Sequence, residues 1–276
     1  MKRRTFSEIL QSAQIDLHRE YDRLYDMFFM SPYPVKVGGA LTLRDFCAAN
    51  FLSFPYCDTC VTLEDFDDFY KFHFERSPSE FDINYLISFC EYTFNFLISF
   101  QSLSYQFAGQ FDPIAFFTNH VSKVIEKIGY MENDMEGIFN IVPKSAPAIA
   151  VSEIVHGRLS YDIIEYNHHS MRGDISKKKD ILYSLANKLE PDRPKLKQIN
   201  ATMDDHLFFL FNNMNIRHNN SDKNSKHYNE YVANMTPMVL EQWYDEIYQL
   251  CLLAFLELDN LARKSKVANL KKAMNP

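Results

Sequence analysis

Apolar residues recur every three or four positions along most of this chain, which is the spacing of one face of an α-helix. The clearest case is the C-terminal run, which carries Leu240, Trp243, Ile247, Leu250, Ala254, Leu258 and Leu261. Thr236-Pro237 precedes this run, as a cap followed by a proline that the first helical turn tolerates. The chain also has only 7 glycines in 276 residues. We therefore expect an all-α fold.

The same periodicity predicts further helices over residues 4–30, 82–107, 113–129, 150–170, 177–190 and 196–216. Residues 40–79 are acidic and aromatic, and their pattern fits a short strand as well as a helix. Residues 136–151 contain β-branched residues and two prolines, which leaves room for a strand. We expect an α-rich region at 1–110, with at most a small strand pair, packed on a helical bundle at 111–276. No flexible linker separates them, so one cooperative unit is favoured.

Charge is distributed unevenly along the chain. Residues 40–140 hold 5 Lys/Arg and 15 Asp/Glu, and 5 − 15 = −10. Residues 167–227 hold 11 Lys/Arg and 7 Asp/Glu, and 11 − 7 = +4. A polyanion would therefore meet the second half of the chain. The excess is too small for avid, nonspecific binding of nucleic acid.

The sequence favours a reduced, cytoplasmic protein. The chain has five cysteines, which is an odd number. Its N-terminus is basic and lacks the apolar stretch of a signal peptide. The most apolar run, residues 83–100, is interrupted by Glu91 and two asparagines, so we expect a buried helix and no membrane partner. The CxxC at Cys57 and Cys60 has no second tight pair of ligands, and we expect neither a metal nor a cofactor.

Candidate chemistry gathers in a polar stretch between the last two predicted long helices. The apolar stripe through Leu210 and Met214 continues onto Arg217, which is followed by His218 and, further on, by His227. Arginine has a planar fork suited to phosphate, and histidine transfers protons near neutral pH. The arginine could instead only compensate a helix dipole, and its loss would then cost about 0.3–1 kcal/mol. The stretch also contains Asn219, Asn220, Lys223 and Lys226 as candidate ligands for RNA or a nucleotide.

A basic, histidine-bearing polar turn at this place in an all-α domain resembles the HEPN superfamily. The run from Lys177 to Asn200, followed by the Arg-His-Asn of residues 217–219, is similar to a branch of bacterial HEPN-like proteins. The resemblance covers roughly residues 151–262. It implies a metal-independent ribonuclease of the toxin or abortive-infection type, with Arg217 as the family's arginine. The family's usual histidine spacing falls on residues 222–224, so the acid–base group is either His218 or His227.

The resemblance also implies partners. HEPN active clefts form between two copies, so we expect a homodimer, with the seam of the last helix available for core or interface. A cognate antitoxin or another protein partner is expected in a toxin or phage-defence setting. HEPN folds also include non-catalytic modules that bind a nucleotide or a partner protein, and this alternative stays open. A purely structural helical protein is a third hypothesis, which the charged turn disfavours.

Overall fold

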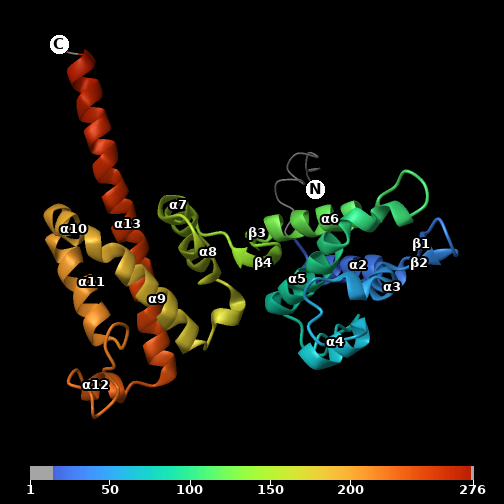
Figure 1. Ribbon diagram of the computed structural model, residues 1–276, viewed down its shortest axis with the longest axis horizontal. Coiled ribbons are helices and arrows are strands. Elements are labelled where there is room, and N and C mark those ends of the chain that lie inside the picture. Colours follow the sequence, from blue (N-terminus) through green and yellow to red (C-terminus); the bar gives the residue numbers. More distant parts are fainter. Residues whose placement is uncertain (1–14, 275–276) are drawn as a thin grey trace, which may run out of the picture. The chain divides into compact units, whose positions relative to one another are not determined.

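The computed structural model describes residues 15–274, and the first part of the helix predicted over residues 4–30 lies outside them. The described chain is mostly helical, with two small two-stranded sheets (Figure 1), so the all-α prediction is confirmed. It divides into two compact units, Met1–Ile141 and Val142–Pro276. The division thus falls 31 residues later than the predicted boundary, because α6 (Pro113–Lys127) packs on the helices that precede it.

The first unit has an aromatic core between three helices. α2 (Leu17–Tyr25), which a π-helical turn extends over Asp26–Met30, packs against α5 (Ile83–Ser99) and α6. Aspartates 16, 82 and 112 begin these helices by accepting a backbone N–H, as expected of Asp caps. The fully buried aromatic side chains of this core are Tyr21, Phe28, Phe46, Phe51, Phe89, Phe96, Phe100 and Phe117.

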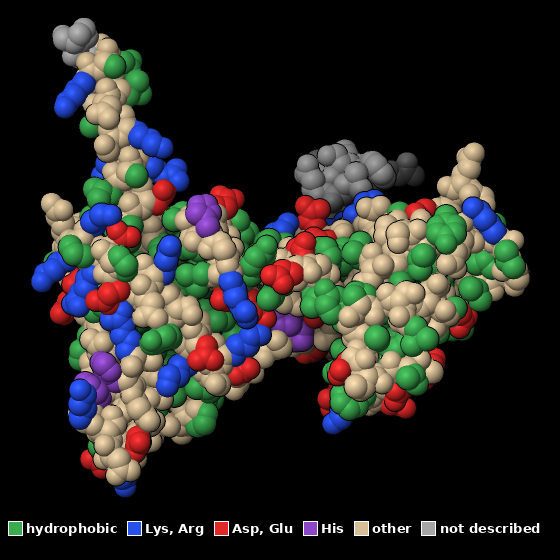
Figure 2. Space-filling view, in the orientation of Figure 1, with side chains coloured by type: hydrophobic (Ala, Val, Ile, Leu, Met, Phe, Trp, Pro, Cys, Tyr) green, Lys and Arg blue, Asp and Glu red, His purple; other side chains and the backbone are tan. Residues whose placement is uncertain are grey.

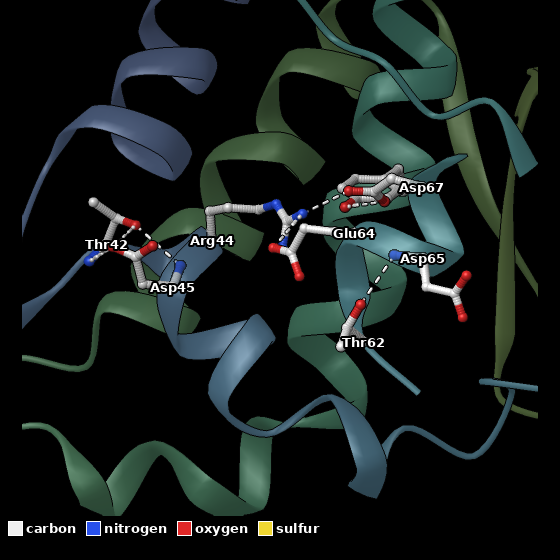
Figure 3. A network of polar contacts seen from close by, with 8 residues as sticks. Thr42, Arg44, Asp45, Thr62, Glu64, Asp65 and Asp67 are labelled. Carbon is white, nitrogen blue, oxygen red and sulfur yellow. Dashed lines mark hydrogen bonds and ion pairs between the residues drawn. The ribbon is translucent and has the colours of Figure 1, made fainter. Parts of the chain in front are cut away.

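The acidic segment that the pattern left open is helical. α3 (Leu43–Ala49) and α4 (Leu63–Tyr70) lie beside each other, and a short sheet of β1 (Tyr33–Pro34) and β2 (Ala40–Leu41) precedes them. Figure 3 shows Arg44 reaching from α3 to Asp67 of α4, at 2.6 Å, and to Glu64. Tyr92 of α5 donates to the other oxygen of Asp67 at 2.8 Å. The contacts of Asp67 with Arg44 and Tyr92 are largely buried and join three helices of the first unit, whereas Glu64 lies at the surface.

The connector at residues 136–151 contains one strand, as its pattern allowed, and this strand pairs with a second one that precedes the connector. β3 (Tyr130–Met135) and β4 (Ile138–Pro143) are joined by Glu136 and Gly137, both at positive φ. Two successive residues of positive φ match the right-handed twist of a tight hairpin. Asn95 of α5 fixes this hairpin through two hydrogen bonds with the backbone of Phe139, each of 2.8 Å.

The second unit is a bundle around the long helix α13 (Pro237–Met274). α7 (Ala146–Val155), α9 (Ile175–Leu189), α10 (Arg193–Ile199) and α11 (Ala201–Asn213) pack against it (Figure 1). α8 (Arg158–Glu165) packs on α7 and α9, and α12 (Glu230–Ala233) lies in the polar stretch. Of the apolar seam predicted for the last helix, Ile247 and Ala254 are buried, whereas Trp243 and Leu261 are 40% and 39% exposed. The buried face of α13 also includes residues that the seam omitted, which are Tyr244, Tyr248, Cys251, Leu252 and Phe255.

Two predicted helices of this unit are each divided in two. The helix expected over 150–170 ends at Val155, because His156 and Gly157 both adopt positive φ before α8 begins. The helix expected over 196–216 is broken at Asn200, whose side chain caps α11 by accepting from the Met203 amide at 3.0 Å. Helix α11 then ends at Asn213, so Arg217 lies beyond the helix rather than on its last turn.

A buried lysine ties α9 to α13. The Lys178 ammonium lies 2.7 Å from both Glu241 and Asp245, and its side chain is only 6% exposed. Asp245 also accepts from the Tyr166 hydroxyl at 3.0 Å. All five cysteines are free thiols. Among residues 15–274, none of the helices combines the length and apolarity that a bilayer crossing requires.

Candidate functional site

The polar stretch folds into an ordered loop around one buried asparagine. Asn220 is 1% exposed and exchanges hydrogen bonds with Asn215, amide to side-chain oxygen in both directions, at 2.8 and 3.1 Å. Its side-chain nitrogen donates to the carbonyls of Asn212 and His227, and its own carbonyl accepts from the Asn229 amide. Asn220 is therefore a positioning residue. It holds the two ends of the loop together and is too buried to be the RNA ligand that the sequence suggested.

The loop brings the two candidate histidines into direct contact. The rings of His218 and His227 stack with centroids 3.9 Å apart and planes 8° apart. Desolvation by burial, and then the charges of His227, Lys226 and Arg217, lower the pKa of His218 below its usual value. The ionisable neighbours that act on this imidazole are all cationic or become so on protonation. His218 is therefore neutral at pH 7, and an anion bound beside it would favour its protonation.

Arg217 points inward and is already occupied. Its guanidinium donates to the carbonyl of Ala186, in the last turn of α9, at 3.0 Å, and forms an ion pair with Glu190. The same group lies 5.2 and 5.4 Å from the ring centroids of Phe208 and Phe211. The side chain is 16% exposed. Arg217 thus compensates the C-terminal end of α9, a different helix from the one on which the sequence placed it.

The remaining candidate residues lie at the surface of the loop. Lys223 and Lys226 are exposed, and no hydrogen bond or ion pair within the described part of the chain engages either ammonium. The Asn219 side chain accepts from the hydroxyl of Ser221 and the amide of Asp222, both at 3.2 Å, so it shapes a turn. Figure 2 shows purple histidine and blue basic side chains beside one another at the end of the second unit that carries α12.

A groove next to this loop contains an aromatic residue that the sequence did not single out. It has a volume of about 550 Å³ and is lined by residues of α12, of the turn that follows it and of the first turn of α13. Tyr231 lines it and is 73% exposed. Glu230 and Asn234 add a carboxylate and an amide to the lining. The sequence signal that could have identified Tyr231 is an aromatic residue close to a basic stretch, because unpaired bases stack on exposed aromatic rings.

The geometry limits the chemistry that one copy of this loop performs. Rings that stack at 3.9 Å leave no space for a phosphate between them. The two histidines therefore do not act as base and acid on opposite sides of one phosphodiester. They present their ring edges side by side, next to Lys226, and such an arrangement binds an anion when the imidazoles are protonated.

No protein family, curated protein or solved structure matches this chain. The site is therefore interpreted from its own residues.

Proposed function

We propose that the second unit is a HEPN-like module that binds single-stranded RNA through the loop between α11 and α12. The observation that carries the proposal is the stacked pair of His218 and His227, whose surroundings are cationic. The two exposed lysines of the loop add charge that no described group neutralises, and the groove at Tyr231 adds a surface for a base. Phosphate and base would thus be bound by neighbouring parts of one loop.

Each part of the loop has a distinct task in this proposal. Lys223 and Lys226 attract the phosphate from solvent, because they are exposed and unpaired. Protonation gives the His218 ring a second N–H donor and a positive charge for a phosphate oxygen, and the bound anion itself promotes this protonation. His227 lies stacked beside it and presents its own ring nitrogens to the same phosphate. Asn220 and Arg217 bind no RNA; the first closes the loop and the second fixes its start to α9.

Metal-independent RNA cleavage is a second candidate, favoured by one observation. The lowered pKa of His218 makes it a proton acceptor at pH 7, as abstraction of a proton from a ribose 2′-hydroxyl requires. The acid for the leaving oxygen would come from the loop of a second copy, as the HEPN resemblance implies. A toxin or phage-defence setting, with an antitoxin or other protein partner, is proposed on the same resemblance.

RNA binding by the full-length chain tests the first candidate. A labelled oligouridine is titrated with the wild type, with Lys223→Ala/Lys226→Ala, and with a matched control, Lys36→Ala/Lys71→Ala, which removes two exposed lysines from the first unit. Each lysine that contacts phosphate contributes about one unit to the slope of log affinity against log salt. We expect the loop variant to lose about two units of slope and the control none. Equal losses, or no binding by the wild type, would contradict the proposal.

Cleavage is tested on the same RNA. If His218 acts as the base, His218→Ala slows cleavage by roughly 10²–10⁴-fold. The products then end in a cyclic phosphate, and EDTA leaves the rate unchanged. RNA that stays intact while bound would remove the second candidate and leave the first.

A further inference from the structure

The last part of α13 projects beyond the bundle of the second unit. Every residue from Asn260 to Met274 is exposed, and Figure 1 shows this end of the helix extending past α10 and α11. Residues 261–274 hold five basic and no acidic residues. Arg263 pairs with Asp259 at 2.6 Å, and four lysines remain. Figure 2 shows blue basic side chains and green hydrophobic ones along this segment.

This basic end of α13, residues 261–274, also has an apolar stripe. Val267, Leu270 and Met274 follow at steps of three and four, so they share one face, and they are 50%, 58% and 71% exposed. Lys266 lies four residues before Leu270, and Lys271 four residues after Val267, so the two lysines flank the stripe. A helical segment of about 14 residues without tertiary contacts is marginal in water. A partner surface would stabilise it.

The first unit presents a surface of the opposite kind on α4. Glu64 and Asp68 lie one helical turn apart and are 69% and 79% exposed. Phe69 is 65% exposed and packs on Tyr70 with ring centroids 4.8 Å apart. Asp65 points away from the Arg44 network in Figure 3. The α4 patch comprises Glu64, Asp65, Asp68, Phe69 and Tyr70 of α4, together with Val61 just before the helix.

We propose that the basic end of α13 docks on the α4 patch of a second copy of this chain. The lysines beside the stripe would meet Glu64 and Asp68, and the stripe itself would cover Phe69 and Tyr70. Two α13 ends do not pair with each other, because each contributes five positive charges and like charges repel. RNA would use the lysines but would leave Val267, Leu270 and Met274 in water. The α4 patch satisfies both the charges and the apolar side chains.

The contact joins two different surfaces. In a closed dimer it therefore occurs twice, with the α13 end of each copy on the α4 patch of the other, and without closure it propagates into longer assemblies. Its ionic part is solvent-exposed and is therefore screened by salt. The proposal does not depend on RNA binding, because it involves neither histidine of the loop.

Sedimentation velocity of the full-length chain, at tens of micromolar and at low and high salt, tests the proposal. We expect an assembly in low salt that dissociates in high salt, and a monomer for Lys266→Glu/Lys271→Glu. The matched control Lys195→Glu/Lys197→Glu reverses two exposed lysines of α10 and keeps the assembly. The reversal Glu64→Lys/Asp68→Lys on α4 also gives a monomer.

The decisive sample carries both reversals, on α13 and on α4, in one chain. Restored association shows that the two surfaces meet, because each reversal alone abolishes it. A wild type that is monomeric in low salt would overturn the proposal, as would a double reversal that stays monomeric. If Lys266→Glu/Lys271→Glu left the assembly unchanged but weakened RNA binding, the basic end of α13 would be an RNA contact and the proposal would be wrong.

Discussion

Replacing Arg217 by alanine separates a structural role from a phosphate-binding role. If the arginine bound phosphate at the edge of a helix, its loss would abolish RNA binding and cost only about 0.3–1 kcal/mol of stability. In the structure the guanidinium instead donates to the carbonyl of Ala186, pairs with Glu190 and lies over two phenylalanine rings. We therefore expect Arg217→Ala to destabilise the second unit and to leave the RNA site intact where the unit is folded.

The magnitude follows from the contacts. A hydrogen bond from a charged donor contributes about 1.5–3 kcal/mol, and the two ring contacts of a largely buried guanidinium about 0.5–1 kcal/mol each. The ion pair with Glu190, which is 48% exposed, adds about 0–1 kcal/mol. The buried Nε of Arg217 has no partner among the described residues, so its removal relieves a desolvation cost. Because such terms are not additive, we expect a net loss of about 2–3 kcal/mol.

Urea unfolding followed by tryptophan fluorescence measures this loss. The chain has a single tryptophan, Trp243 of α13, so the signal reports on the second unit. Glu190→Gln is the control, because it removes only the half-exposed ion pair and should cost less than about 1 kcal/mol. RNA affinity is compared at low temperature, where the variant stays folded, and should change by less than about threefold. An Arg217→Ala protein within about 0.5 kcal/mol of wild type that no longer binds RNA would refute the structural role.

Three further predictions concern the loop and the bundle. Asn220→Ala should cost about 2–4 kcal/mol, because three side-chain hydrogen bonds are lost at a buried position, and NMR should show the His218 and His227 rings no longer stacked; rings still stacked would contradict this role. RNA affinity should rise as pH falls from 8 towards 6, because bound phosphate raises the lowered pKa of His218. Stability should change in the opposite sense: the contribution of His218 is present above its unfolded pKa of about 6.5 and is lost as pH falls through the folded value. Fluorescence anisotropy checks the affinity and urea unfolding checks the stability, and an RNA affinity that does not change with pH would exclude the histidines from the site. Lys178→Met should cost about 3–5 kcal/mol in urea, because two carboxylates lose their buried partner, and a loss below 1 kcal/mol would show that solvent replaces it.

The sequence identified most of the helices and the residues at which several of them begin. Asp82, Asp112 and Asp174 each cap the helix that follows them, and Thr236-Pro237 precedes the last one, because capping and proline geometry act within three or four residues. The sequence-based prediction of helix ends failed where the apolar spacing continued across a point at which the helix is interrupted. His156-Gly157 and Asn200 divide helices whose stripes read as continuous, since one residue of non-helical φ and ψ ends a helix without changing the hydrophobic pattern.

The same contrast holds for the candidate site. Composition and order along the chain were enough to gather Arg217, His218, His227 and the two lysines into one stretch between the last long helices. Only the tertiary structure decided what each does. Eight residues lie between the two histidines in sequence, and Asn220 folds the loop so that their rings stack. Arg217 lies 31 residues from Ala186, and helix packing turns it from solvent to the end of α9. A hydrophobic period records which face is buried, but it does not record which distant carbonyl a side chain will meet.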